Sequence, residues 1–460
     1  MGHMGISARK RIWGWYFFDW ASQPYSTLLL TFIFGPYFAH VATQHFMAAG
    51  ADGDAARASA QALWGTGLTL SGLLIAVLSP VLGAIADGSG RRMVWIWAFS
   101  LLYVLGAGGL WYLTPTGDFL TPAVALFGIG LIGMEFATTF TNALLPGLGN
   151  EEEIGALSGS GFAFGYLGGV LSLILTLVFL AESGDSGRTL AGLRPGFGLL
   201  DPATMQGTRF VGPLTALWYI IFMIPFFLWV KEPRRAAADR VPPMAALRGL
   251  WASVLGLGRR HSLRNYLLSS MFYRDALNGL FSFGGVYAYG VLGWSTPQIG
   301  LFGILGAVTA TLASWWGGRL DARFGPKPVI TGSVLVLIGV CLVVVGMNRE
   351  SLFGMPLQAG SSLPDLIFYL CGALIGGAGG TVQAASRTLV VRHTSPERAA
   401  ETFGLFAFTG KATAFLAPGL ITLATALSRD QQIGITPLIG LFLLGIVLLA
   451  WVNPKGEPRP

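Results

Sequence analysis

The chain alternates long apolar runs with short polar connections. Each of twelve such runs carries little or no charge and is long enough to cross a bilayer as a helix, which takes about 20 residues. Their length and continuity favour helices over the strands of a membrane barrel. The pattern therefore predicts an all-α integral membrane protein with transmembrane helices at about 12–39, 61–86, 93–113, 119–146, 154–181, 210–230, 265–293, 296–318, 328–347, 366–386, 402–428 and 432–453.

One polar connection, residues 231–264, is longer than the others and separates six predicted helices from six. We expect an N-terminal bundle (5–230), a cytoplasmic linker (231–264) and a C-terminal bundle (265–460). The linker is basic with some apolar content, so both an interfacial helix lying on anionic lipid and a plain connection are open. Residues 1–4 (MGHM) are interpreted as a cloning remnant.

The two halves resemble each other at three places. GAIADGSGRRMV after the second predicted helix is similar to GGRLDARFGPKPV after the eighth, and FAF occurs at 162–164 and 406–408. WYFFDWAS in the first helix aligns with MFYRDALN in the seventh, which sets Asp19 against Asp275. Because the three matches keep their order, we predict two pseudo-symmetric six-helix bundles. Secondary transporters with this architecture bind substrate near the midplane between the repeats.

Charge orients the predicted helices. Only 11% of the residues are charged and the mean hydropathy is +0.63, whereas soluble domains are about 25% charged. With the N-terminus inside, 21 of the 29 Lys and Arg residues fall on the inner side and 6 on the outer side. Cytoplasmic Lys and Arg explain the basic chain better than nucleic-acid binding does. We expect a multi-pass protein of the bacterial inner membrane with both termini in the cytoplasm.

The loop GAIADGSGRR resembles the signature G-x-x-x-D-R-x-G-R-R of the major facilitator superfamily. Gly88 stands where the signature has arginine. The resemblance implies the major facilitator fold, in which helices 1, 4, 7 and 10 line a central cavity. Five positions match the signature: Gly83, Asp87, Gly90, Arg91 and Arg92.

A finer resemblance covers nearly the whole chain. GWYFFDWASQPYSTLLLTFIFGPYF resembles the aromatic-D-W-A-[NS] opening of the autophagy-related vacuole-effluxer family and its bacterial permease relatives. FYRDALN and GGTVQAASRTL resemble that family's motifs in helices 7 and 10, and FTNALLPGL and SGSGFAFGYLGGV resemble the helix 4 end and helix 5. This resemblance implies a solute permease that works by alternating access. The eukaryotic relatives are linked to amino-acid efflux.

Five ionisable side chains fall within the predicted helices. Each costs roughly 2.5–3.5 kcal/mol at a helix centre, so we expect them to face protein, water or one another. Four of the five lie on helices 1, 4 and 7, which the resemblance places around the cavity. With two polar residues on helices 4 and 10, they form the predicted substrate-binding or proton-binding set: Asp19, Glu135, Arg274, Asp275, Asn142, Gln383 and Lys411.

Each of these residues has a structural alternative. Glu135 is the candidate for proton coupling, because a buried carboxyl takes up a proton near neutral pH; the alternative is an ion pair with Lys411 or Arg274. Arg274 suits bidentate binding of an anion or a salt bridge between helices. Asp19 and Asp275 either attract a cation or proton, or stabilise nearby helix turns. Lys411 binds substrate or forms a buried pair, and Asn142 and Gln383 bind ligand or bond another helix.

A second set of residues lies at the inner ends of the helices. Asp87 is predicted to act in gating, because an acid there can pair with arginine or face a helix N-terminus; a solvated turn is the alternative. Asp321 is its repeat counterpart. Arg387 either closes the same inner network or is simple inner-side charge. The predicted gating residues are Asp87, Arg91, Arg92, Asp321 and Arg387.

Other classes of function find little support in the sequence. Cys341 and Cys371 both lie in apolar runs, so we expect no disulfide framework and no metal site, and we predict no cofactor and no enzymatic activity. We therefore predict a proton-coupled secondary transporter of a small polar or zwitterionic solute, such as an amino acid or short peptide. The alternatives are a proton antiporter exporting an amphiphilic compound and a non-transporting receptor. The expected partners are the solute, protons and membrane lipid, without nucleic acid, and the expected state is a monomer.

Overall fold

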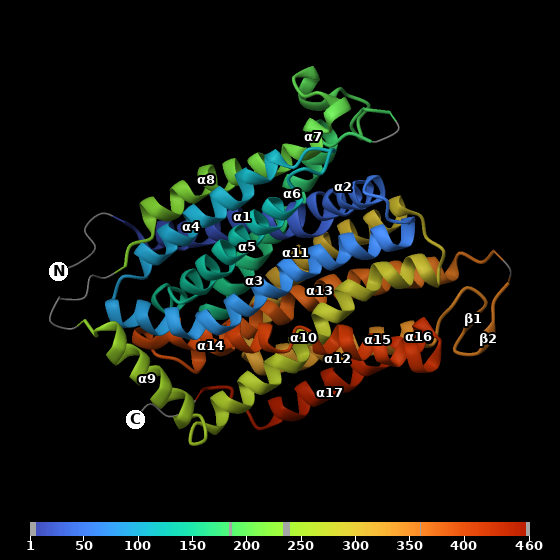
Figure 1. Ribbon diagram of the computed structural model, residues 1–460. Coiled ribbons are helices and arrows are strands. Elements are labelled where there is room, and N and C mark those ends of the chain that lie inside the picture. The colour runs from blue at the N-terminus through green and yellow to red at the C-terminus, as the bar shows by residue number, and fades with distance from the viewer. Residues whose placement is uncertain (1–5, 184–185, 233–239, 359, 457–460) are drawn as a thin grey trace. The chain divides into compact units, whose positions relative to one another are not determined.

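The computed structural model describes residues 6–183, 186–232, 240–358 and 360–456 (Figure 1). The interpretation of residues 1–4 as a cloning remnant, and part of the predicted linker (233–239), lie outside the described residues. The described chain is almost entirely helical apart from one antiparallel hairpin, in which β1 (Ser351–Leu352) pairs with β2 (Met355–Pro356). The predicted all-α membrane architecture is confirmed.

The helices of the first half begin at Ala8, where Ser7 accepts a hydrogen bond from the backbone of Lys10 and caps the first turn. In chain order they are α1 (Ala8–Pro24), the π-helix η1 (Tyr25–Phe32), α2 (Phe34–Ala48), α3 (Gly53–Ser89), α4 (Arg92–Gly109), α5 (Leu120–Asn142), α6 (Ile154–Phe179), α7 (Gln206–Arg209) and α8 (Val211–Trp229). Short 3-10 turns lie between them: η2 (Leu110–Tyr112), η3 (Leu145–Gly147), η4 (Pro195–Gly198) and η5 (Pro202–Thr204).

The second half begins in the predicted linker. Its elements are α9 (Pro243–Gly256), α10 (His261–Gly290), α11 (Thr296–Phe324), α12 (Pro326–Val345), α13 (Leu363–Arg392), η7 (Pro396–Arg398), α14 (Ala399–Ala412), α15 (Leu416–Ser428), α16 (Gln431–Gly434) and α17 (Thr436–Ala450). Within this half α11 packs along α13, α10 along α17, and α12 along α13. The sequence left the linker open between a helix and a plain connection, and α9 shows that part of it is helical.

Eleven helical segments of the described chain are long and apolar enough to span a membrane. The twelfth predicted span corresponds to α10, which is 30 residues long but carries Arg274, Asp275 and Asn278 in its middle. Asp275 is buried and Arg274 is half-buried, whereas Asn278 is exposed, so the two charged side chains of the three are covered by the protein. The structure is therefore consistent with twelve membrane-spanning helices.

Packing divides the described chain into two compact units. One holds residues up to 75, 91–141 and 164–232, and the other holds 76–90, 142–163 and 240–456. The end of α3 and the segment from the end of α5 into α6 thus pack with the second half of the sequence. The predicted boundaries of the two bundles stay a prediction, because the packing units exchange the segments 76–90 and 142–163 and so do not divide the chain at one point.

Two predicted spans depart from a regular α-helix, and a proline lies at each departure. Helix 1 becomes π-helical directly after Pro24. Helix 11, expected as one span over 402–428, ends at Ala412 and restarts at Leu416. Pro418 explains this break, because its ring clashes with the carbonyl four residues earlier and it has no N–H to donate. The predicted span over 402–428 is kept as one membrane-spanning segment, and the structure adds that it consists of two helices.

Candidate functional site

Asp87, near the end of α3, caps the N-terminus of α14. Its Oδ2 accepts a hydrogen bond from the backbone N–H of Glu401 at 2.8 Å, and its Oδ1 accepts one from Ala400 at 3.2 Å. First-turn N–H groups have no partner within their own helix, and the helix dipole favours a negative charge beside them. The carboxylate is only 5% exposed. The predicted gating acid therefore joins the end of α3 to the start of α14.

The backbones of α3 and α14 touch beside this cap. A Cβ on Gly83 would lie 2.3 Å from the carbonyl oxygen of Ala400, and a Cβ on Gly404 would lie 2.4 Å from the carbonyl oxygen of Ser79. Any side chain at either glycine would collide with main-chain atoms, which cannot move aside cheaply. The two glycines thus allow the close approach that lets Asp87 reach the N–H groups of α14.

Arg387 of α13 makes a second set of contacts in the same unit, with the segment that runs from the end of α5 into α6. Its Nη1 donates to Oδ1 of Asn142 at 3.0 Å, while Nε and Nη2 donate to the hydroxyl and carbonyl oxygens of Ser158 at 2.9 and 2.8 Å. Its guanidinium also lies 4.3 Å from the centre of the Phe162 ring. Arg387 is 3% exposed, so it is a buried connector rather than surface charge. We call the Asp87 and Arg387 contacts together the clamp.

Asp321, the repeat counterpart of Asp87, lies in a similar crossing of α6 with α11. A Cβ on Gly159 would lie 2.4 Å from the carbonyl oxygen of Ser314, and a Cβ on Gly155 would lie 2.8 Å from Cγ of Asp321. Asp321 is buried, and among the described residues neither of its oxygens accepts a hydrogen bond of normal geometry, although Thr388 lies close. The two acids therefore share a position in the repeat but not a set of partners.

Arg91 and Arg92 lie at the start of α4, in the other unit. Nε of Arg92 is 4.0 Å from Oε1 of Glu232, and Oε2 of Glu232 accepts a hydrogen bond from the backbone N–H of Met93. Arg92 thus fastens the start of α4 to the chain that follows α8. Arg91 is exposed at the N-cap of α4. A gating role for these two arginines stays a prediction.

Three of the predicted binding residues gather where helix 11 is broken. Asp275 of α10 accepts a hydrogen bond on Oδ2 from the backbone N–H of Ala417 at 2.9 Å, in the first turn of α15. It is 1% exposed, and Oδ1 has no hydrogen-bond partner among the described residues. Lys411 lies in the last turn of α14. The break therefore brings an acid to one helix start and a cation to the neighbouring helix end, as the helix dipoles favour.

Arg274 faces α14 rather than α15. Its Nη1 donates to the carbonyl oxygen of Phe406 at 2.8 Å, and its guanidinium lies 4.0 Å from the centre of the Phe406 ring. Gly410 leaves room for it, because a Cβ there would lie 2.6 Å from the guanidinium atoms. Arg274 and Asp275 are about 100° apart on α10. Arg274 therefore contacts α14, while Asp275 contacts α15.

Asp19 and Glu135 lie in the unit that holds α1 and α5. Asp19 is half-buried against α6, where a Cβ on Gly165 would lie 3.2 Å from its own Cβ. Trp20, the residue after Asp19, stacks on Trp218 with ring centres 5.7 Å apart. The aromatic side chains at the start of the chain therefore pack α1 against α8. Glu135 is half-buried on α5. Neither residue shares its unit with Arg274, Asp275 or Lys411.

The two neutral residues of the predicted set differ in their surroundings. Asn142 lies in the clamp, where its side-chain oxygen is occupied by Arg387. Gln383 is half-buried on α13, and its amide donates to the carbonyl oxygen of Gly379 one turn earlier. The hydrogen bond of Asn142 is the inter-helix alternative considered from the sequence. A ligand-binding role for either residue stays a prediction.

Two buried polar residues in the structure, Ser158 and Glu182, are not among the residues predicted from the sequence. Ser158, which binds Arg387 twice, lies in SGSGFAFGYLGGV, a segment that the sequence singles out only by its resemblance to the family's helix 5. Glu182, just after α6, is buried and accepts a hydrogen bond on Oε2 from the backbone of Thr208 at 3.0 Å. Burial raises the pKa of the Glu182 carboxyl above its usual range. No motif marked this acid, because it lies in a connection between helices.

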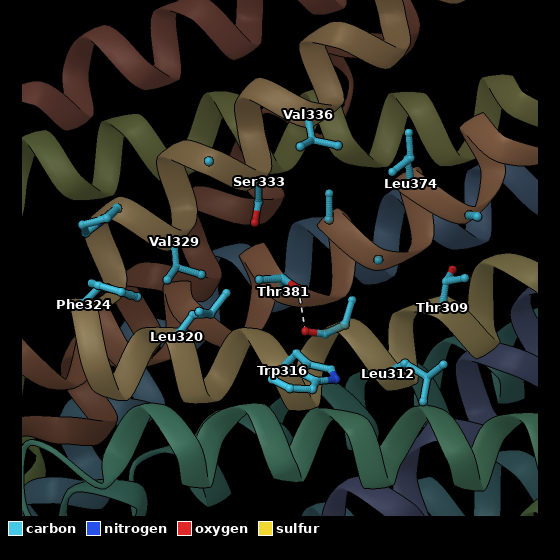
Figure 2. Close-up of a pocket in the computed structure, with 16 residues that line it drawn as sticks. Thr309, Leu312, Trp316, Leu320, Phe324, Val329, Ser333, Val336, Leu374 and Thr381 are labelled. Carbon is cyan, nitrogen blue, oxygen red and sulfur yellow. Dashed lines mark hydrogen bonds between the residues drawn. The ribbon is translucent and has the colours of Figure 1, made fainter.

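A groove of about 860 Å³ opens between α11, α12 and α13 (Figure 2). Its walls are mainly apolar, and Leu312, Trp316 and Phe324 in them are exposed. Ser333 and Thr381 supply hydroxyl groups, but none of the predicted site residues lines it. The lining of this groove is therefore a poor match for the polar solute predicted from the sequence.

Comparison with known proteins gives a consistent result. The profile of the family described as "Vacuole effluxer Atg22 like" matches residues 7–457. The chain is 24% identical over 441 residues to YxiO of Bacillus subtilis (strain 168), described as an uncharacterized MFS-type transporter, with 95% of this chain and 94% of YxiO covered. It is 24% identical over 304 residues to autophagy-related protein 22 of Cryptococcus neoformans, with 64% of this chain and 50% of that protein covered.

Solved structures show the same fold at low identity. The proton:xylose symporter XylE, bound to 6-bromo-6-deoxy-D-glucose, matches with a TM-score of 0.69 and 12% identity, covering 97% of this chain and 95% of XylE. The E. coli fucose:proton symporter FucP matches with a TM-score of 0.65 and 16% identity, covering 98% and 99%. These likenesses confirm the predicted major facilitator fold.

Proposed function

The chain belongs to the family of Atg22-like vacuole effluxers, and on this premise we propose that it is a proton-coupled secondary transporter of a small zwitterionic solute such as an amino acid or short peptide. The broken helix 11 supports this proposal most. Discontinuous spans in transporters use the ends of half-helices to bind charged groups of substrates and coupling ions. The break here carries Asp275 at the start of α15 and Lys411 at the end of α14.

We assign the coupling proton to one of two acids within the spans, Asp275 or Glu135, each taken in its own packing unit. Asp275 is favoured by its surroundings, because its Oδ1 is buried and accepts no hydrogen bond from the described residues. A buried polar oxygen without a hydrogen-bond partner is unfavourable, and a bound coupling proton would occupy this oxygen. Glu135 is the candidate from the sequence and is half-buried. A solute with both charges suits a site that offers Asp275, Arg274 and Lys411.

The clamp is proposed to be the inner gate. Its two parts join the ends of α3 and α5 to α13 and α14, so releasing it would free the inner ends of helices from both halves of the sequence. The positive-inside distribution supports cytoplasmic termini and a bacterial inner membrane. A monomer is proposed as the working unit, to be checked by light scattering in detergent.

The test is transport by the purified protein in proteoliposomes that enclose a pH-sensitive dye. Mixed amino acids or dipeptides are added outside, and a coupled transporter moves protons together with the solute. Asp275→Asn and Glu135→Gln are compared with Asp118→Asn, which changes an exposed acid between α4 and α5. We expect the coupling variant alone to lose proton movement while solute counterflow persists. Proton movement opposite to the solute would instead support an antiporter, and solute counterflow in all variants with no proton movement would refute coupling.

A further inference from the structure

Helix α9 of the linker has two apolar faces, and among the described residues only one of them packs on the protein. Ala246 and Leu250 are buried. Met244, Trp251 and Leu255 lie on the opposite side of the helix, as their spacing of seven and four residues requires, and Trp251 and Leu255 are 66% and 68% exposed. A second apolar face on a surface helix marks an interaction site, because exposing it to water is unfavourable.

The ends of α9 lie at the level where membrane spans end. Just before α9, the backbone N–H of Val241 donates to the carbonyl oxygen of Gly88 near the end of α3 at 2.9 Å. The helix stops at Gly256, and α10 begins shortly afterwards at His261 (Figure 1). A helix tied in this way to the ends of two spans lies at the boundary between hydrocarbon and water.

The charge of this segment is of one sign. Residues 240–264 contain five arginines and neither aspartate nor glutamate. Arg248 lies within the exposed stripe of Met244, Trp251 and Leu255, is itself exposed, and forms no ion pair among the described residues. An amphipathic helix with cations beside exposed tryptophan and leucine suits an anionic lipid surface, and juxtamembrane basic clusters are attracted to such lipids.

We propose that α9 docks its exposed face on anionic phospholipid of the membrane surface proposed above to be cytoplasmic. Met244, Trp251 and Leu255 enter the boundary between headgroups and acyl chains, and Arg248 binds the lipid phosphates. A soluble protein partner is disfavoured, because the apolar stripe lies at the membrane boundary and its only charge is one that lipid phosphate complements.

Docking also places lipid next to the clamp. Gly88, which holds Val241, directly follows Asp87, and a Cβ on Gly88 would press on Val241 and Ala246 at 3.2–3.3 Å. From the other side, Nη2 of Arg398 at the N-cap of α14 donates to the hydroxyl of Ser253 in α9 at 2.7 Å. Since α9 contacts both helices that Asp87 joins, anionic lipid stabilises the clamp; this second step rests on the gate proposed above.

The experiment uses the full chain in nanodiscs of phosphatidylcholine alone or mixed with phosphatidylglycerol. Leu255→Cys carries an environment-sensitive fluorophore, and Ala245→Cys, exposed on the flank of α9, is the matched control. The native Cys341 and Cys371 are buried and react slowly. We expect spin-labelled lipid to quench the Leu255 probe strongly in anionic discs, with iodide gaining access in neutral discs. Adding Arg248→Gln lowers the apparent affinity for phosphatidylglycerol about fivefold.

A Leu255 probe equally open to iodide in both lipids overturns the docking surface. Protection that appears only with two copies of the protein per disc assigns the face to a second copy and also overturns it. Hydrogen exchange of the first turn of α14, measured in the same discs, tests the second step separately. Lipid protection of the probe with unchanged exchange there keeps the docking surface and refutes its coupling to the clamp.

Discussion

Arg387 binds Ser158 at two atoms, its hydroxyl through Nε at 2.9 Å and its backbone carbonyl through Nη2 at 2.8 Å. The pair joins α13 to α6, which are 229 positions apart in the sequence at these residues. A planar guanidinium can hold two acceptors in fixed directions while its third nitrogen reaches Asn142, whereas an ammonium group is a point charge. The contact therefore depends on arginine specifically and not on positive charge alone.

We predict that Arg387→Lys destabilises the protein despite keeping the charge. Losing hydrogen bonds of a buried charged group costs about 1.5–3 kcal/mol, so the unfolding temperature in detergent should fall. Arg323→Lys is the matched control, because Arg323 is exposed on α11. Equal stability of the Arg387→Lys variant and the unmodified protein would show that charge is sufficient.

Asp87→Asn is expected to loosen the start of α14. The amide keeps an acceptor oxygen but loses the charge that the helix dipole favours, which is worth about 0.3–2 kcal/mol. Hydrogen exchange of Ala400 and Glu401 should become faster. The control is Asp52→Asn, since Asp52 accepts N–H groups of Asp54 and Ala55 at the exposed start of α3; it should leave α14 unchanged.

Gly404→Ala is expected to separate α3 from α14. The added methyl would lie 2.4 Å from the carbonyl oxygen of Ser79, and such overpacking costs about 1–3 kcal/mol. Exchange at the first turn of α14 should rise and the unfolding temperature should fall. Gly339→Ala on α12 is the control, because nothing lies within 4 Å of the added atom. Similar results for both variants would mean that the crossing tolerates a wider gap.

Glu182 gives a pH dependence whose sign follows from its raised pKa. The folded state holds a proton that the unfolded chain releases at about pH 4.3, because burial disfavours the charged carboxyl. Stability from this group is therefore complete below that pH and is lost as the pH rises through the folded pKa. Glu182→Gln should flatten this part of a curve of unfolding temperature against pH. An unchanged slope would assign the pH dependence to other groups.

The sequence predicted the number and type of membrane helices because burial in lipid depends on each apolar run by itself. Helix 11 shows the limit of that reasoning. The sequence stays apolar through 402–428, but the backbone hydrogen bonds of the helix are interrupted just before Pro418. The carboxylate of Asp275, on α10, then accepts a hydrogen bond from the start of the new helix. Composition reports whether a segment belongs in lipid and not whether its backbone is continuous.

The clamp was predictable on one side only. Asp87 and Arg387 stood out as charges at helix ends, yet their partners are mostly backbone N–H and carbonyl groups, which every residue carries. Ala400 and Ser158 therefore had no distinctive signal. Conversely, the sequence predicts Asn142 to be a ligand-binding residue, but the structure places its side-chain oxygen against Arg387. Side-chain chemistry identified the charged member of each contact, and only the fold identified the other member.

The cap of α14 by Asp87 also bears on the order in which the protein is made. Asp87 and Glu401, whose backbone N–H donates to the Asp87 carboxylate, are 314 residues apart. Ten of the twelve predicted spans therefore precede the helix that Asp87 caps. During synthesis the Asp87 carboxylate at the end of α3 therefore cannot form this cap until the ribosome has produced almost the whole chain. A nascent chain that stops before Ala399 can insert most of its helices, but it cannot complete the packing of α3.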